Sequence, residues 1–139
     1  MLDYGLEYKN AILNLVHKKG IAIIFDIHGC SNKYPYDIDI GTNNGININK
    51  ENNILQAICE LLSPLGKIGI DENFKASQDT TICNYIHKES NILCFQFELG
   101  KSLRTDPDKL IQLIKCFEII IQELSKYFPP IQNDDELEK

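Results

Sequence analysis

The sequence predicts an α/β domain in which a mainly parallel central sheet is covered by helices on both faces, giving three layers. Segments with helical apolar periodicity alternate along the chain with short β-branched runs, which is typical of this architecture. These runs carry few polar residues, as expected of strands buried on both faces. The 139 residues, 43% hydrophobic and 24% charged, suit one globular domain. We assign residues 1–130 to it and residues 131–139 to an acidic, disordered tail.

Helices are predicted near residues 7–19, 50–62 and 80–87 and, at greatest length, from residue 107 onward. Gly20 is placed to end the first helix. Asp106 and Pro107 are a cap and a first helical residue for the last one. The inward face of the first helix is predicted to hold Tyr8, Ile12, Leu15 and Val16. The inward face of the last helix is predicted to hold Leu110, Leu113, Ile114, Phe117, Ile120, Ile121, Leu124 and Phe128.

Three apolar runs are expected to be the central strands of the sheet, at residues 21–27, 67–71 and 91–99. A shorter segment, residues 37–40, alternates polar and apolar residues. Such alternation indicates a strand with one solvated face. We therefore expect Asp37 and Asp39 on the outer face of an edge strand.

Charge and cysteine content exclude several classes of protein. The net charge is -6 and the basic residues are scattered, which argues against nucleic-acid binding. Five cysteines without a CxxC pair argue against a zinc-finger site and favour a reducing compartment with inert buried thiols. The chain opens without a signal-peptide pattern and contains no apolar run of about 20 residues. We expect a cytoplasmic protein with no membrane association.

Two polar clusters follow predicted strands, where ligands bind in α/β sheets. His28 ends the first strand and could bind a metal ion, or be a hydrogen-bonded structural residue. Gln96 and Glu98 leave one face of the third strand, and burial would raise the pKa of Glu98 toward that of a general base. A salt bridge with Arg104 or Lys101 is the alternative for Glu98. Both His28 and Glu98 should then project into one cleft.

Asp26 and Cys30 lie two residues before and after His28, and each has its own expected role. Asp26 lies in an apolar run, where a carboxylate needs a partner. We expect it to point away from His28 and to accept a hydrogen bond from a backbone or hydroxyl donor. Cys30 suggests a thiol nucleophile, but that chemistry needs a base and an oxyanion hole, and the sequence identifies neither.

Three segments together resemble the N-formylglutamate amidohydrolase family. They are residues 24–30 (IFDIHGC), 35–45 (PYDIDIGTNNG) and 94–99 (CFQFEL). Residues 71–74 (DENF) and 80–82 (TTI) also occupy similar positions, so the resemblance spans about residues 4–105. The family is similar in fold and site to zinc carboxypeptidases, a phosphorylase/hydrolase-like fold. Its members hydrolyse an amide next to a glutamate-like carboxylate.

The resemblance implies a role for three residues. His28 matches a zinc-ligand histidine, and Glu98 matches the glutamate that activates the metal-bound water. Zn²⁺ lowers the pKa of such a water to about 7. Arg104 could clamp the substrate carboxylate with two hydrogen bonds, or be a surface residue before the last helix. The implied ligand is a small anionic amide or a glutamate-like molecule.

The sequence departs from the family upstream of His28. Two further zinc ligands precede the matching segment in the family, whereas only 27 residues precede His28 here. Zinc hydrolysis needs three protein ligands and an open position. One reading is a shortened or incomplete amidohydrolase, which would need Zn²⁺ if its site is complete. The other is a domain without metal or activity that binds a ligand, or that self-associates as a homo-oligomer through an incomplete sheet.

Overall fold

A computed structural model describes residues 5–129 of the chain. Helices and strands alternate, as the sequence predicts. In chain order they are α1 (Leu6–Lys19), β1 (Ile23–Cys30), β2 (Ile38–Gly41), η1 (Ile46–Ile48), α2 (Asn52–Leu62), η2 (Ser63–Leu65), β3 (Ile68–Ile70), α3 (Ile82–Ser90), β4 (Leu93–Gly100), α4 (Lys101–Thr105) and α5 (Pro107–Leu124). The predicted tail, residues 131–139, lies outside the described residues.

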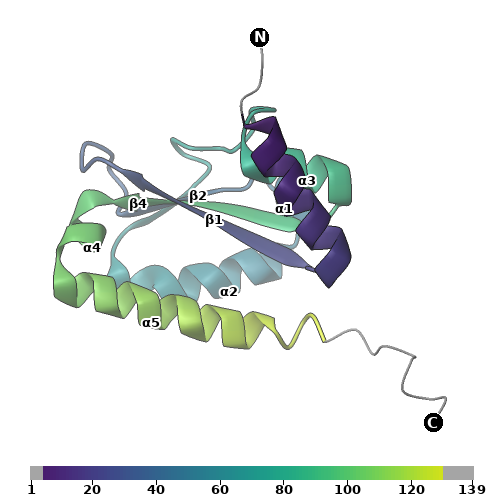
Figure 1. The fold of residues 1–139 in the computed structure, drawn as a ribbon. Helices are drawn as coiled ribbons and strands as arrows, with labels where there is room; N and C mark the ends of the chain where they lie inside the picture. Colours follow the sequence, from purple (N-terminus) through teal and green to yellow (C-terminus); the bar gives the residue numbers. More distant parts are fainter. Residues whose placement is uncertain (1–4, 130–139) are drawn as a thin grey trace.

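The four strands form one mixed sheet in the order β1-β4-β2-β3. The pairs β1–β4 and β2–β3 are parallel, and the central pair β4–β2 is antiparallel. Helices α1 and α3 lie on one side of the sheet, and α2 and α5 lie on the other (Figure 1). The α/β class is thus confirmed. A mainly parallel sheet is not, because its central pairing is antiparallel.

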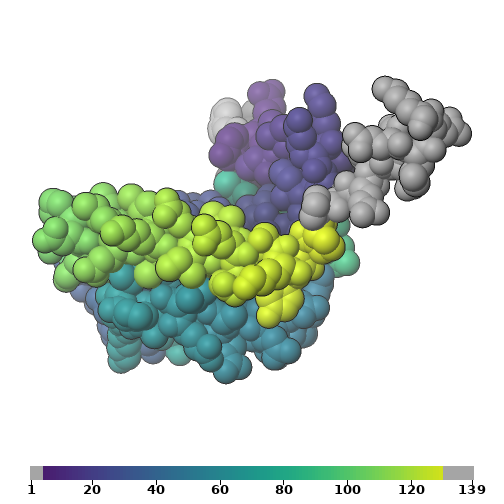
Figure 2. Space-filling view, turned by 90° about the horizontal axis from the view of Figure 1, so that it is seen from below, coloured from purple at the N-terminus to yellow at the C-terminus, as the bar shows by residue number. Residues whose placement is uncertain are grey.

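Most of the hydrophobic core lies between the sheet and helices α2 and α5. Phe95, Phe97, Ile38 and Ile40, from the two inner strands, are fully buried there. The two helices run side by side over this face (Figure 2). A smaller cluster lies under α1 and α3. Between residues 5 and 129, no helix has the length and apolar character needed to cross a membrane.

The helix ends that were predicted from local chemistry are confirmed. Gly20 takes a left-handed conformation with φ 61°, and its N–H donates to the carbonyl of Val16. The Asp106 side chain accepts hydrogen bonds from the N–H groups of Asp108 and Lys109 at the start of α5. These helix ends could be predicted from the sequence because each depends on residues only a few positions apart.

The predicted positions of the strands within the sheet are partly wrong. Strands β1 and β3, expected to be central, are the two edges, and only β4 is central. In β1 the side chains are half-buried or exposed. The short strand β2, expected at an edge, lies between β4 and β3 and is buried throughout. Strand order depends on pairings between distant segments, so the local pattern could not indicate it.

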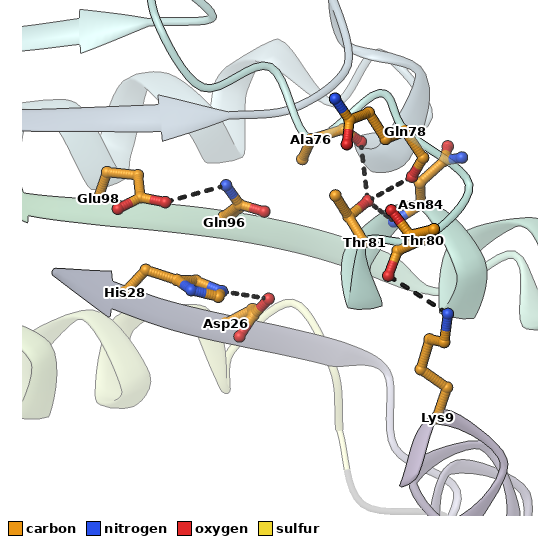
Figure 3. A network of polar contacts seen from close by, with 10 residues as sticks. All are labelled: Lys9, Asp26, His28, Ala76, Gln78, Thr80, Thr81, Asn84, Gln96 and Glu98. Atoms are coloured by element: carbon orange, nitrogen blue, oxygen red, sulfur yellow. Dashed lines mark hydrogen bonds and ion pairs between the residues drawn. The ribbon is translucent and has the colours of Figure 1, made fainter. Parts of the chain in front are cut away.

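Two helix faces also differ from the prediction. In α1, Tyr8 and Leu15 are exposed, whereas Val16 and Lys9 are buried. The Lys9 Nζ donates to the carbonyl of Thr80, 3.3 Å away (Figure 3). Helix α1 packs mainly against α3, and of the predicted face only Ile12 and Val16 join the smaller core.

In α5, Ile114 and Ile121 were expected to face inward. They are 52% and 59% exposed. Phe117, on the same helix, packs against Phe25 of the edge strand β1. No strand lies beyond β1 within the described residues, and the side of α5 nearest that edge is therefore open.

Candidate functional site

Polar side chains from three strands share one face of the sheet. His28, Glu98 and Asp39 are opposite one another in the pairing of β1, β4 and β2. Asp26 and Gln96 form the next row, two residues back along the strands. Residues opposite each other across a sheet, or two apart along a strand, point to the same face. The two polar clusters of the sequence therefore meet, as predicted for His28 and Glu98.

The alternation of apolar residues explains which face this is. Phe25, Phe95 and Phe97 pack together in the core below the sheet. The residues between them point to the opposite face, on which α1 and α3 lie. There Ile24 and Cys94 pack in the smaller core. The polar residues come later in β1 and β4, toward the carboxyl ends of both strands.

His28 is paired with Asp26, contrary to the prediction that Asp26 points elsewhere. The Nε2 atom of His28 lies 2.8 Å from Oδ2 of Asp26 (Figure 3). The His28 side chain is 44% exposed, and that of Asp26 only 13%. The error arose because residues two apart on a strand share a face, so Asp26 follows His28 instead of avoiding it.

Glu98 is a buried carboxylate, with 7% of its surface exposed. It accepts a long hydrogen bond of 3.4 Å from Nε2 of Gln96 (Figure 3). Its pKa is raised above the usual value, chiefly by burial and further by the negative charges of Asp26 and Asp39; His28 and Arg104 oppose this shift. A carboxyl group of this kind can take up and release a proton closer to neutral pH.

Asp39 is a site residue that the sequence reasoning missed. It is 3% exposed and accepts hydrogen bonds from the backbone N–H groups of Asn73 (2.7 Å), Phe74 (3.0 Å) and Glu72 (3.4 Å). It thereby holds the loop after β3 over the polar face. The alternation at residues 37–40 correctly predicted that Asp39 points away from the neighbouring isoleucines. It was wrong about solvent, because the loop after β3 covers this face of β2.

A shallow depression of about 290 Å³ opens beside His28 and Glu98. It is lined by His28, Gly29, Cys30, Ser31, Lys33, Tyr34, Phe74 and Glu98. Tyr34 and Phe74 meet edge to face at 4.9 Å, and the Lys33 ammonium lies 5.1 Å from the centre of the Tyr34 ring. Lys33 is the cation that lines this depression, and sequence reasoning did not single it out.

Arg104, the predicted substrate clamp, holds the ends of β1 and β4 together. Its Nε donates to the carbonyl of Leu99 (3.2 Å) and its Nη2 to the carbonyl of Cys30 (3.0 Å). The guanidinium lies against Gly29, where a Cβ would come within 2.6 Å of its Cζ atom. A Cβ on Gly29 would point away from the His28 side, so Arg104 packs on the other face of β1.

The described residues do not fit a zinc site. Among residues 5–129, no three or more His, Cys, Asp or Glu side chains are placed to hold one metal ion. The Nε2 atom of His28, one of its two potential ligand atoms, is already engaged by Asp26. Zinc hydrolysis requires three protein ligands, and His28 and Glu98 do not supply them.

Cys30 lines the depression but lacks the properties of an activated nucleophile. Burial and the negative charge of Glu98 raise the pKa of its thiol, and Arg104 only partly opposes them. A raised pKa keeps the thiol protonated, whereas the thiolate is the reactive form.

Comparison of the chain with protein-family models, with curated proteins and with solved structures finds no match. The relation to N-formylglutamate amidohydrolases therefore stays a prediction from three sequence segments. What the structure adds is the meeting of two of those segments, 24–30 and 94–99, along the full length of β1 and β4.

Proposed function

We propose that the depression beside His28 and Glu98 binds a small amide, and that Glu98 transfers protons there, as in a hydrolase of the N-formylglutamate amidohydrolase type. One observation carries this proposal. Glu98 is a buried carboxylate with a raised pKa, and it lines the same depression as His28. A general base needs access to the substrate, and burial that raises the pKa of a carboxyl group favours this role.

The neighbouring residues have separate roles in this proposal. Asp26 orients the His28 ring through its Nε2 atom, and a carboxylate partner of this kind sets both the tautomer and the direction of an imidazole. Lys33 is the group for a ligand carboxylate, because it is a basic residue that lines the depression. Arg104 is not assigned to the ligand, since its guanidinium donates to two carbonyls.

Zn²⁺ has no assigned step in this proposal. The described residues lack a three-ligand set, so a zinc-dependent reaction would need ligands from elsewhere. The test therefore measures whether the reaction rate depends on added metal.

The test uses the purified full chain with N-formylglutamate, and measures formate release with added Zn²⁺ and with a chelator. Glu98→Gln should lower the rate by about 100-fold or more, the usual contribution of a general base. Glu118→Gln is the matched control, because Glu118 is exposed on α5 and should leave the rate unchanged. No formate release under either condition would end the catalytic proposal.

A second candidate, binding without catalysis, is favoured by the lack of three metal ligands within residues 5–129. A glutamate-like ligand should then raise the melting temperature by mass action without being consumed. Lys33→Ala should abolish this shift. Lys115→Ala, a change at an exposed position of α5, should preserve it. No shift at millimolar ligand would remove this candidate.

A further inference from the structure

Strand β1 is eight residues long and forms one edge of the sheet within residues 5–129. It is the outermost strand of the sheet, and within the described residues it pairs only with β4. The carbonyl of Ala22 accepts from the N–H of Leu93, so the even-numbered residues that follow direct their backbone groups toward β4. The N–H and C=O groups of the odd-numbered residues therefore point outward; these residues are Ile23, Phe25, Ile27 and Gly29.

An apolar strip accompanies this edge on the α5 side. Ile27 of β1 is 52% exposed, and Ile114 and Ile121 of α5 are 52% and 59% exposed. Ile121 lines a hollow of about 660 Å³ together with Ile23 and Phe25. Ile114 lies seven residues earlier, on the same side of the helix. An open edge beside exposed isoleucines is a surface suited to strand addition.

The opposite face of the same edge carries a pair of unlike groups. Asp26 and His28 lie on either side of Ile27 in the chain, and both project toward the face on which α1 and α3 lie. A carboxylate and an imidazole, equally spaced about one exposed apolar residue, form a self-complementary pattern. A twofold axis through Ile27 would bring each group opposite its counterpart.

We propose that β1 pairs antiparallel with β1 of a second copy of this chain, about a twofold axis through Ile27. In this register Ile27 lies opposite Ile27, and Asp26 of each copy lies opposite His28 of the other. The outward backbone groups of Ile27 then form a hydrogen-bonded pair. The two four-stranded sheets become one continuous sheet, with the isoleucine strips of both copies on the same side.

Neighbouring registers are disfavoured by charge. Because the twofold axis preserves the two faces, residues on the polar face can only oppose each other. Centring the axis on Asp26 would place two carboxylates in direct contact, which destabilises a strand pair. Centring it on His28 would oppose two imidazoles and place each Asp26 opposite Cys30, with no unlike charge across the strand pair. Only the axis at Ile27 makes unlike pairs on one face and an apolar pair on the other.

This pairing goes beyond the proposed function and does not depend on it. It also extends the site, because Asp26 of the second copy would continue the row formed by His28, Glu98 and Asp39. We infer a second copy of the chain as the partner because the arrangement of Asp26, Ile27 and His28 is complementary to itself after a twofold rotation.

The first test is the mass of the full chain in solution, by light scattering and sedimentation over a concentration series. The wild-type chain should be a dimer. Ile27→Lys places a charge at the axis and should raise the dissociation constant at least tenfold, as lysine on a strand edge opposes pairing. Ile46→Lys is the matched control, since Ile46 is 53% exposed and lies in η1, away from β1.

The second test examines the register. Asp26→His should weaken the dimer, because it opposes two imidazoles. The double variant Asp26→His with His28→Asp should restore it, because the unlike pairs return with their positions exchanged. Circular dichroism checks that each variant is folded. Any of three results would overturn the proposal: a wild-type chain that stays monomeric at about 0.1 mM, a dimer that tolerates Ile27→Lys, or a double variant whose dimer stays weak.

Discussion

His28 lies directly across from Glu98 in the parallel pairing of β1 and β4. The two residues are far apart in the chain, and this register brings them together. On the same side of the sheet, Asp26 fixes the imidazole and Asp39 fixes the covering loop. The site is thus a row of side chains across three strands, and four measurements test this row and the residues around it.

The raised pKa of Glu98 predicts a pH-dependent difference in stability between wild type and Glu98→Gln. The native state binds the Glu98 proton more tightly than the unfolded chain, whose glutamic acid has a pKa of about 4.3. Between the two pKa values the native state carries more protons, so the free energy of unfolding falls as the pH rises. Glutamine does not titrate.

The stability of Glu98→Gln relative to wild type should therefore increase as the pH rises from about 4.3, and level off above the native pKa. Urea unfolding at a series of pH values measures this difference. Glu118→Gln should show a flat difference over the same range. A stability of Glu98→Gln relative to wild type that stays constant or falls as the pH rises would contradict the prediction.

The three amide hydrogen bonds to Asp39 predict a large cost for its removal. Asp39→Ala removes the acceptor of the Asn73 and Phe74 N–H groups, in a loop whose residues 71–75 are half-buried or exposed. The expected loss is about 1–3 kcal/mol for each amide that stays buried and unsatisfied. Chemical denaturation measures it. Asp79→Ala is the control: the Asp79 side chain is 85% exposed, and its loss should cost no more than about 0.5 kcal/mol.

The contact of Arg104 with Gly29 predicts energetic coupling between the two positions. Gly29→Ala would place a methyl group within 2.6 Å of the guanidinium Cζ and displace it from the carbonyls of Leu99 and Cys30. In an Arg104→Ala background that contact no longer exists, so the cost of Gly29→Ala should shrink by about 1 kcal/mol, the worth of a typical hydrogen bond. Additive effects in this double-mutant cycle would refute the coupling.

The cysteines predict a graded pattern of alkylation. Cys83 and Cys94 are buried, and a mutual hydrogen bond, followed by burial, raises the pKa of Cys83. Both should react with iodoacetamide only after unfolding. Cys30 is half-buried, and the Glu98 charge contributes to its raised pKa. Mass spectrometry should find Cys30 alkylated faster in Glu98→Gln than in Glu118→Gln. Equal rates would show that the two groups do not interact.

Local chemistry was enough to predict most of the elements. The left-handed glycine after α1 and the Asp106–Pro107 start of α5 depend on residues within one turn, so the sequence signals them directly. The alternation in β4 likewise placed Gln96 and Glu98 on one face. The candidate residues His28 and Glu98 could be selected for the same reason, since both are polar positions at the ends of apolar strands.

Only the tertiary structure decided which strands are neighbours, and much of the site follows from that. An apolar run such as β1 reads as a buried strand, yet it is the edge, and β2 lies inside although it carries Asp39. The sequence by itself determined where most helices and strands form and that Gln96 and Glu98 share one face of β4, because these depend on the local backbone period. It did not determine which faces of α1 and α5 are buried. The pairing of distant strands, the loop over Asp39 and the open edge of β1 arise from long-range contacts, whose energies no short segment contains.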